Sequence, residues 1–348
     1  MKRFLLGLLC CLVFMQGLSV KAQETEMTHV TLEEADISIM LPITCYLLGQ
    51  NITENDPYLE KVGGDREKIQ NYYKDAGIKI TVVQPPENGA ELMTASGKAQ
   101  FGVSFQDSLA PAFVGDAIMP VTAVAAVIQH NTSGIVSRAG EGMDTPKGLE
   151  GKKYATWDLD VEKATIRDVM KADGGNFDLV QLIPSTVTDE VSALQSGSVD
   201  AIWIFYGWAG IACQVAGLPI DYFDFADFDP VLDFYTPIIV SNNDYLAENP
   251  ETAKAFLSAL SRGYEYAAEN PKEAADILME AAPELKSNTE LVYRSQEYLA
   301  KEYIADASQW GEFDKERWAS FFNWLNENSL LESEIDPDYG FTNDYLPH

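Results

Sequence analysis

Cysteine and histidine are scarce in this chain. Its 348 residues include four cysteines, of which Cys10 and Cys11 lie in an apolar N-terminal run. The three histidines, His29, His130 and His348, are far apart in the sequence. Structural zinc sites and disulfide frameworks need such residues clustered at short spacings. The scarcity therefore argues against a disulfide scaffold, a metal site and catalysis by a histidine-activated nucleophile.

Positive charge is also in short supply. The chain has 24 Lys and Arg against 54 Asp and Glu, a formal net charge of -30. A surface of this sign repels the phosphates of nucleic acids and the headgroups of anionic lipids, so we expect no nucleic-acid partner. The 46% of hydrophobic residues is enough for a large core, and the length allows two lobes.

The N-terminus has the composition of a secretory signal. Residues 1–22 begin with Lys2 and Arg3, continue as an apolar run and end at Ala22, a small residue that suits cleavage. The run is marginal for a membrane-spanning helix, which needs ~20 apolar residues. We predict a cleaved signal peptide and an exported protein, in the periplasm or on the outer face of the cytoplasmic membrane. A retained anchor, or lipidation of Cys10 or Cys11, is the alternative.

From Gly77 to Asn242 the sequence alternates between short strands and short helices. This alternation predicts an α/β fold with parallel or mixed sheets that are covered by helices. The expected strands are 78–84, 101–105, 121–129, 152–157, 178–183, 201–206 and 235–242, with a further strand after the polar stretch 129–133. The expected helices are 90–98, 107–116, 160–175, 188–200 and 207–217.

From Asn243 onward the sequence is nearly all helical. Two helices have proline near their starts, at Pro250 and Pro271. A last amphipathic helix spans 312–331, and we interpret its apolar stripe as core. The stripe consists of Trp318, Phe321, Phe322 and Leu325.

Two strand–helix series followed by a helical return predict two lobes. After the signal peptide (1–22), we assign 23–130 to the first lobe, 131–236 to the second and 237–348 to the return into the first. The expected crossings between lobes are 129–137 and 233–241. Small ligands usually bind in a cleft between such lobes.

The polar stretch Gln129–Ser133 lies at the first crossing. Asn131 can fix the turns of a hinge with its side chain, or it can contact a guest in the cleft, and both interpretations stay open. His130 is interpreted as a hydrogen-bonded structural residue rather than a catalytic base.

Five stretches occur in the order typical of one family: QPPENGAELMTASGKAQFGVSFQDSLAPA, VAAVIQHNTSGIVS, PKGLEGKKYATW, WIFYGWAGI and DFYTPIIVSN. From about Tyr72 onward the chain resembles solute-binding proteins of ABC importers in the sulfonate and thiamin-precursor superfamily. The most similar branch is that of the formylaminopyrimidine-binding proteins.

The resemblance implies a two-lobed periplasmic-binding-protein fold of type II, with two crossover strands at the hinge and a helical C-terminal region. It implies capture of an aminopyrimidine thiamin precursor, of the formylaminopyrimidine or hydroxymethylpyrimidine type, for thiamin salvage. The protein would be a monomer without cofactor or catalytic activity, and would deliver its ligand to an ABC permease.

Other functions on the same fold stay open. Fungal pyrimidine-precursor synthases resemble this fold but carry a cysteine-rich iron motif, whereas Cys45 and Cys213 stand alone here. A sulfonate, taurine or flavin is a different ligand, and a sulfonate would favour Arg or Lys in the cleft. The family's usual Trp-Thr-Pro-Asn stretch is missing from residues 36–71, so no ligand contact is assigned there.

A flat pyrimidine needs aromatic faces for stacking. Four aromatic residues lie at or just after the ends of expected strands, where α/β lobes present ligand contacts. They are Trp157, Tyr206, Trp208 and Tyr235. Each of the four could instead pack in the core, and both interpretations stay open. Trp203, inside an expected strand, is assigned to the core.

The polar edge of a pyrimidine needs donors and acceptors. Glu162 could accept a hydrogen bond from an exocyclic amine, or it could complement the start of its own helix. Ser104 and Gln106 could offer a hydroxyl, an amide and nearby helix N–H groups, or could face solvent. With Asn131, these residues complete the expected ligand-binding set. No metal ligand is expected.

Overall fold

The computed structural model describes residues 28–33, 72–83, 89–116, 118–185 and 187–347. The expected signal peptide, Cys45 and the divergent segment 36–71 lie outside these ranges. Within them, no helix is both long enough and apolar enough to cross a membrane.

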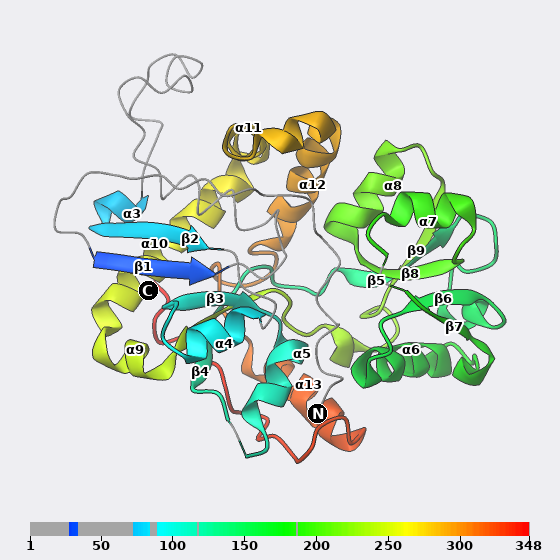
Figure 1. Cartoon of the computed structure of the whole chain (residues 1–348), viewed down its shortest axis with the longest axis horizontal. Coiled ribbons are helices and arrows are strands. Elements are labelled where there is room, and N and C mark those ends of the chain that lie inside the picture. Colours follow the sequence, from blue (N-terminus) through cyan, green and yellow to red (C-terminus); the bar gives the residue numbers. More distant parts are fainter. Residues whose placement is uncertain (1–27, 34–71, 84–88, 117, 186, 348) are drawn as a thin grey trace.

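The described strands form two mixed five-stranded sheets, which lie at opposite ends of the long axis of the molecule (Figure 1). The first sheet has the order β2 (Ile78–Val83), β1 (Thr28–Glu33), β3 (Phe101–Ser104), β10 (Ile238–Asn242) and β4 (Val121–Ala126). The second has the order β7 (Gln181–Pro184), β6 (Lys153–Thr156), β8 (Ala201–Phe205), β5 (Ser133–Arg138) and β9 (Ile220–Asp224). In the first sheet β10 is antiparallel to β3 and β4, and in the second β5 is antiparallel to β8 and β9. The remaining pairs are parallel.

Helices cover both sheets. With the first sheet lie α3 (Tyr72–Asp75), α4 (Gly89–Ala95), α5 (Gln106–Leu109), α9 (Asn243–Glu248), α10 (Pro250–Glu269), α11 (Pro271–Ala281) and α12 (Thr289–Glu302). With the second lie α6 (Asp160–Ala172), α7 (Glu190–Ser196), the π-helical turn η5 (Tyr206–Gly210) and α8 (Ile211–Val215). We call these two assemblies the first and the second lobe. The last helix is α13 (Lys315–Glu327).

The alternating elements confirm the expected mixed α/β class, with a few local differences. The helix expected over 107–116 is wrong beyond Leu109, where the chain tightens into a 3-10 turn over Ala110–Phe113. Pro111 explains the change, because it has no backbone N–H with which to continue an α-helix. Strands β1 and β9 were not expected from the sequence, whereas helices α9 and α12 lie in the stretch from Asn243 onward that was expected to be nearly all helical.

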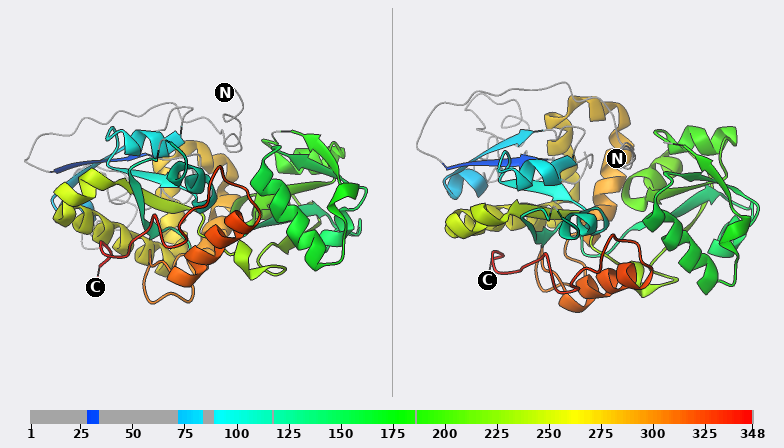
Figure 2. Two further views of the ribbon diagram at one scale, coloured as in Figure 1. Left: turned by 90° about the horizontal axis from the view of Figure 1, so that it is seen from below. Right: turned by 60° about the horizontal axis from the view of Figure 1, so that its bottom comes forward.

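Helix α13 lies at the junction of the two lobes (Figure 2). Its Trp318, Phe321 and Phe322 are fully buried, which confirms that the apolar stripe is core. Their cluster includes Ile238 of the first sheet and Ile135 of the second, so one continuous core joins the lobes. A separate cluster, with Phe101 stacked on Phe256, fills the rest of the first lobe.

The chain passes between the sheets twice, through residues 127–132 and 225–237. The two passages are hydrogen-bonded to each other. The backbone N–H of Val127 donates to the carbonyl of Pro237 at 3.0 Å, and that of Asn131 donates to the Asp233 carboxylate at 2.8 Å. The connection between the lobes is therefore a paired, cross-linked strip rather than two independent linkers.

Candidate functional site

The carboxyl ends of the parallel strands of the second sheet point toward the first lobe. Strand β8 leads directly into η5, whose Tyr206 ring lies 5.3 Å from the ring of Tyr298 on α12. Because β6 and β7 run parallel to β8, their carboxyl ends lie at the same edge. Loops at this edge are where α/β lobes usually hold small ligands.

A pocket with a volume of about 110 Å³ opens at this edge. Its walls come from the ends of β6 and β8, the segment after β7, the start of α7 and η5. The lining residues are Ala155, Trp157, Ser185, Val187, Glu190, Ile202, Trp203, Ile204, Phe205, Trp208 and Ala209. The pocket is thus mainly aromatic and aliphatic, with one hydroxyl and one carboxylate. None of these described lining residues is basic.

Tryptophan side chains dominate the pocket wall. Trp157 and Trp208, both expected ligand contacts, are half-buried there. The rings of Trp157 and Trp203 lie 5.8 Å apart, and Trp203 packs in turn on Phe225 at 4.4 Å. Trp203 is buried, as expected, but it also lines the pocket, so the core directly supports the wall. Phe205 remains 39% exposed beside them.

Glu190 is a pocket residue that the sequence did not single out. It is the first residue of α7, whose preceding residue Asp189 accepts a hydrogen bond from the backbone N–H of Ser192 at 2.9 Å. That cap fixes the start of the helix and thereby the position of Glu190. Burial raises the pKa of the Glu190 carboxyl above its ordinary value. The pocket therefore holds one partly desolvated acid.

Glu162 does not line the pocket, but it holds the loop that carries the pocket residue Trp157. Its carboxylate accepts hydrogen bonds from the Tyr154 hydroxyl at 2.7 Å, from the Thr156 hydroxyl at 3.0 Å and from the backbone N–H groups of Trp157 and Leu159. Burial raises the pKa of Glu162, while these donors act in the opposite direction. Since its acceptors are occupied within the protein, it holds the loop that presents the Trp157 ring.

Tyr206 is a contact between the lobes. Its ring packs on Tyr222 at 4.8 Å and on Tyr298 of α12, and its hydroxyl accepts a hydrogen bond from Gln214 at 2.5 Å. The neighbouring Gly207 permits the close approach, because an added Cβ would lie 2.7 Å from the Leu299 side chain. The motif FYGW thus combines a lobe-to-lobe contact with one wall of the pocket, from Trp208.

Gln106 and Tyr235 are buried where the second passage rejoins the first lobe. The Gln106 amide donates to the Trp318 carbonyl at 3.0 Å and accepts from the backbone N–H of Tyr235 at 2.9 Å. The Tyr235 hydroxyl accepts from the backbone N–H of Asp314 at 2.7 Å, and the Arg317 guanidinium lies over its ring. Both side chains therefore tie chain segments together.

Asn131 and Ser104 are also buried and bonded within the protein. The Asn131 amide donates to the Leu232 carbonyl at 2.8 Å and accepts from the backbone N–H of Ser133 at 2.9 Å, so it joins the two passages between the sheets. The Ser104 hydroxyl, at the carboxyl end of β3, donates to the Glu91 carboxylate at 2.5 Å. Burial raises the pKa of Glu91.

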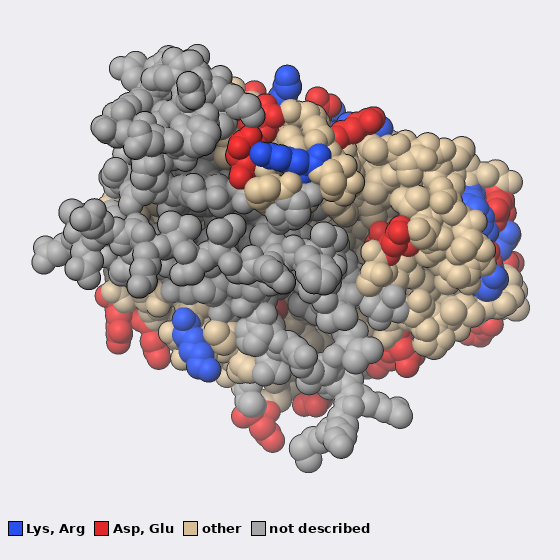
Figure 3. All heavy atoms as spheres, turned by 45° about the horizontal axis from the view of Figure 1, so that its top comes forward, with Lys and Arg blue, Asp and Glu red and all other residues tan. Residues whose placement is uncertain are grey.

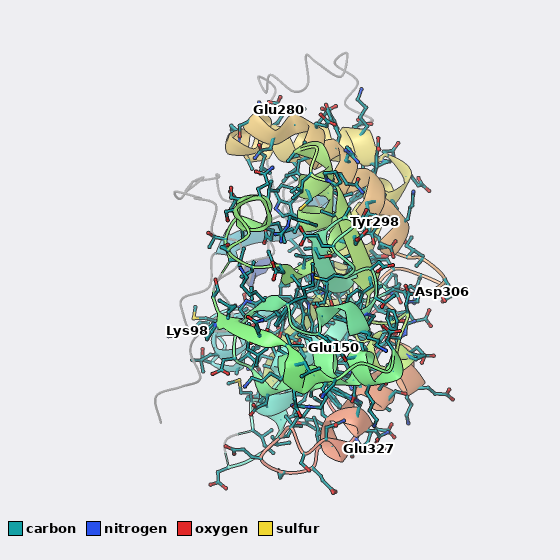
Figure 4. All side chains as sticks on the ribbon, turned by 90° about the vertical axis from the view of Figure 1, so that its right-hand side faces the viewer. Lys98, Glu150, Glu280, Tyr298, Asp306 and Glu327 are labelled. Atoms are coloured by element: carbon teal, nitrogen blue, oxygen red, sulfur yellow. The ribbon has the colours of Figure 1, made fainter. Side chains whose placement is uncertain are left out.

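His130 forms an ionic cluster at the crossings. Its Nδ1 lies 2.7 Å from Asp233 and its Nε2 lies 2.9 Å from Asp306, while Arg317 lies 3.6 Å from Asp233. Tyr298 and Asp306 lie along the same edge of the molecule in Figure 4. An imidazole with a carboxylate at each nitrogen is a double donor and therefore a cation. The hydrogen bond to Asp233 raises the pKa of His130 to about 9.

The His130 cluster predicts a pH-dependent stability. Because the folded-state pKa is raised, the stabilisation is complete below the ordinary value of ~6.5 and is lost as the pH rises through about 9. We expect the melting temperature of the wild type to exceed that of His130→Gln at pH 6.5, and the difference to shrink by pH 9.5. Scanning calorimetry measures both, and a difference independent of pH would contradict the cluster's role.

Charge is distributed unevenly over the second lobe. On the face shown in Figure 3, its Lys and Arg side chains gather mainly at the outer edge, away from the first lobe. Arg138 illustrates this, since it ends β5 and pairs with Asp200 at 3.0 Å and with Glu141. Arg138 is thus held in ion pairs at the end of β5 that lies opposite the pocket edge.

Within the described ranges, no group of three or more His, Cys, Asp or Glu side chains is arranged so that it could hold a metal ion. Cys213 is buried, and burial raises the pKa of its thiol to about 11. A second hollow, about 300 Å³, is lined by Ala95–Gly97, Ala99, Gln100, Asn242, Asp244, Tyr245 and Glu248. It lies at the edge of the first sheet where β3 begins, away from the other lobe.

Two α/β lobes joined by a double crossing, with a pocket where they face each other, define a periplasmic-binding-protein fold. The aliphatic sulphonate binding protein SsuA from Escherichia coli has the same fold, with a TM-score of 0.63 at 15% identity. The alignment covers 89% of this chain and 90% of that protein.

The chain belongs to the NMT1/THI5-like family, whose model matches residues 66–274. It is 27% identical to the formylaminopyrimidine-binding protein of Halalkalibacterium halodurans, over 79% of this chain and 83% of that protein. It is 22% identical to the 4-amino-5-hydroxymethyl-2-methylpyrimidine phosphate synthase of Aspergillus parasiticus, over 80% and 81% of the respective lengths. These matches confirm the resemblance seen in the motifs.

Proposed function

We propose that the protein is the extracytoplasmic solute-binding component of an ABC importer, and that it binds an aminopyrimidine of the thiamin-precursor type. The ligand would be of the formylaminopyrimidine or hydroxymethylpyrimidine kind. The observation that carries the proposal is the tryptophan-walled pocket at the carboxyl edge of the second sheet. The related protein of H. halodurans supports the ligand class by its name.

The size and lining of the pocket suit one small ring. Its volume of about 110 Å³ compares with the ~150 Å³ cavity that holds benzene in another protein, and lies below the ~300 Å³ at which larger ligand pockets begin. A flavin would need far more room. Aromatic walls favour a flat ring, and the absence of Lys and Arg among the described lining residues disfavours a sulfonate.

We further propose that lobe boundaries near residues 130/131 and 236/237 form the hinge of a closing motion, as in other binding proteins. In this arrangement residues 23–130 and 237–348 make the first lobe and 131–236 the second. A closed, ligand-bound monomer would then dock on its permease. Export by the N-terminal signal, residues 1–22, is part of the same proposal.

The synthase of A. parasiticus makes an enzyme the competing function. The described pocket residues favour binding, since they offer a carboxylate and a hydroxyl but neither an amine nor a thiol that could attack a carbonyl group. For the same reason we include no cofactor in the proposal.

Thermal stability in the presence of ligands tests the proposed function. A ligand at ~100 times its dissociation constant stabilises the folded state by ~2.7 kcal/mol, so formylaminopyrimidine or hydroxymethylpyrimidine should raise the melting temperature clearly. Taurine serves as the negative control at equal concentration. A rise with taurine, together with none for any pyrimidine, would overturn the assignment.

A further inference from the structure

Among the described residues, Glu190 is the charged group in the wall of the pocket. It sits at the first position of α7, lines the pocket together with Trp157 and Trp208, and is half-buried. The capped start of the helix holds its backbone in place, so the carboxylate is a fixed feature of the pocket rather than a mobile surface acid.

The hydrogen bonds of this carboxylate distinguish it from the other buried acids. Glu162 accepts from four donors and Glu91 accepts from the Ser104 hydroxyl. For Glu190, the described part of the chain supplies its own backbone N–H but no ion pair and no side-chain donor. A partly desolvated carboxylate without such partners is stabilised by a donor that enters the pocket.

We propose that Glu190 determines the specificity of the pocket by binding the amidine edge of the ligand, formed by a ring nitrogen and the adjacent exocyclic amine. This rests on the proposed function. A carboxyl group offers two oxygens side by side, which match two neighbouring nitrogens in a paired hydrogen bond. One proton is shared between ring nitrogen and carboxyl group, and the amine donates to the second oxygen.

The same arrangement excludes other ligands. A sulfonate or phosphate has acceptors only and meets the negative charge of Glu190, with no basic side chain among the described lining residues to compensate. A pyrimidine with a carbonyl in place of the amine directs a lone pair at the carboxylate. Because the walls are apolar, each mismatch is poorly screened by water.

Isothermal titration calorimetry with matched ligands and variants tests the inference. The probes are 4-amino-5-hydroxymethyl-2-methylpyrimidine and its analogues with hydrogen or oxygen in place of the 4-amino group. Wild type should bind the amino compound at least tenfold more tightly than either analogue. Glu190→Leu, which removes both carboxyl oxygens, should lose at least tenfold in affinity for the amino compound and should bind all three compounds within about threefold of one another.

Asp144→Asn is the matched control. It removes one negative charge from an exposed residue that follows β5 in the same lobe and does not line the pocket, and it should bind as wild type does. Equal affinities of wild type for the three pyrimidines, or an unchanged preference in Glu190→Leu, would overturn the inference while leaving pyrimidine binding intact. Failure of wild type to bind any of the three would instead reject the proposed function. Equal affinities of wild type would overturn the inference even if the variant does not fold.

Discussion

Replacing Trp157 with alanine should weaken pyrimidine binding about tenfold or more, without unfolding the protein. The indole is half-buried on the pocket wall and packs on Trp203, and its backbone is held from behind by Glu162. A stacked aromatic contact contributes ~0.5–1.5 kcal/mol beyond the area that it buries, and tenfold corresponds to ~1.4 kcal/mol. The loss therefore reflects the stacking together with part of the buried area.

Isothermal titration calorimetry measures the pyrimidine affinity of purified Trp157→Ala, with Phe177→Ala as the matched control. Phe177 is a half-buried aromatic side chain of the same lobe, but it precedes β7 and lies at the outer edge of the sheet, under the Arg167 guanidinium. Its removal should leave the affinity unchanged. If the two variants bound equally well, Trp157 would belong to the core and the pocket would lie elsewhere.

The position of the pocket follows from sequence patterns that are local. Alternating strands and helices place Trp157 and Trp208 just beyond strand ends, and the structure puts both on one pocket wall. These positions can be predicted from the sequence because each strand and the turn after it are contiguous in the chain. Whether these rings contact the ligand stays a prediction.

The polar members of the site were harder to foresee. Gln106 and Tyr235 also follow strand ends, yet their hydrogen bond joins residues 129 positions apart and turns both inward. Glu190 appeared as one acid among several at a helix start, where dipole complementation is the ordinary role. Its place in the pocket depends on the fold bringing the start of α7 beside the ends of β6 and β8, which no local pattern encodes.

The strands that local sequence patterns did not predict are short and contain polar residues. Strand β9 contains Asp221 and Asp224 and lies at the edge of its sheet, where pairing with β5 alone makes it a strand. Burial raises the pKa of Asp224 to about 7, which shows how far the folded lobe alters a residue that looks solvent-exposed in the sequence. The long-range pairing of β9 with β5 therefore determines this strand, although its acidic composition does not favour one.

The largest effect on stability should come from Trp318 of α13. Its indole is fully buried, contacts Phe313, Phe322 and Phe341 and donates from Nε1 to the Tyr339 carbonyl at 3.0 Å. Removing a buried Trp side chain typically costs ~3–5 kcal/mol, because the lost contacts leave a cavity. We expect Trp318→Ala to lower the free energy of unfolding by that amount.

Trp318 also joins the two lobes, so its replacement should affect the unfolding of both. The Trp318 carbonyl accepts from Gln106 of the first lobe, and its cluster includes Ile135 and Tyr154 of the second sheet. Because one core serves both lobes, wild type should unfold in urea as a single transition, and Trp318→Ala should shift the whole transition to lower urea. Trp318→Phe keeps most of the ring contacts and should lose markedly less. Two separate transitions in wild type, or a loss below ~1 kcal/mol in Trp318→Ala, would show that the lobes have independent cores and that α13 does not join them.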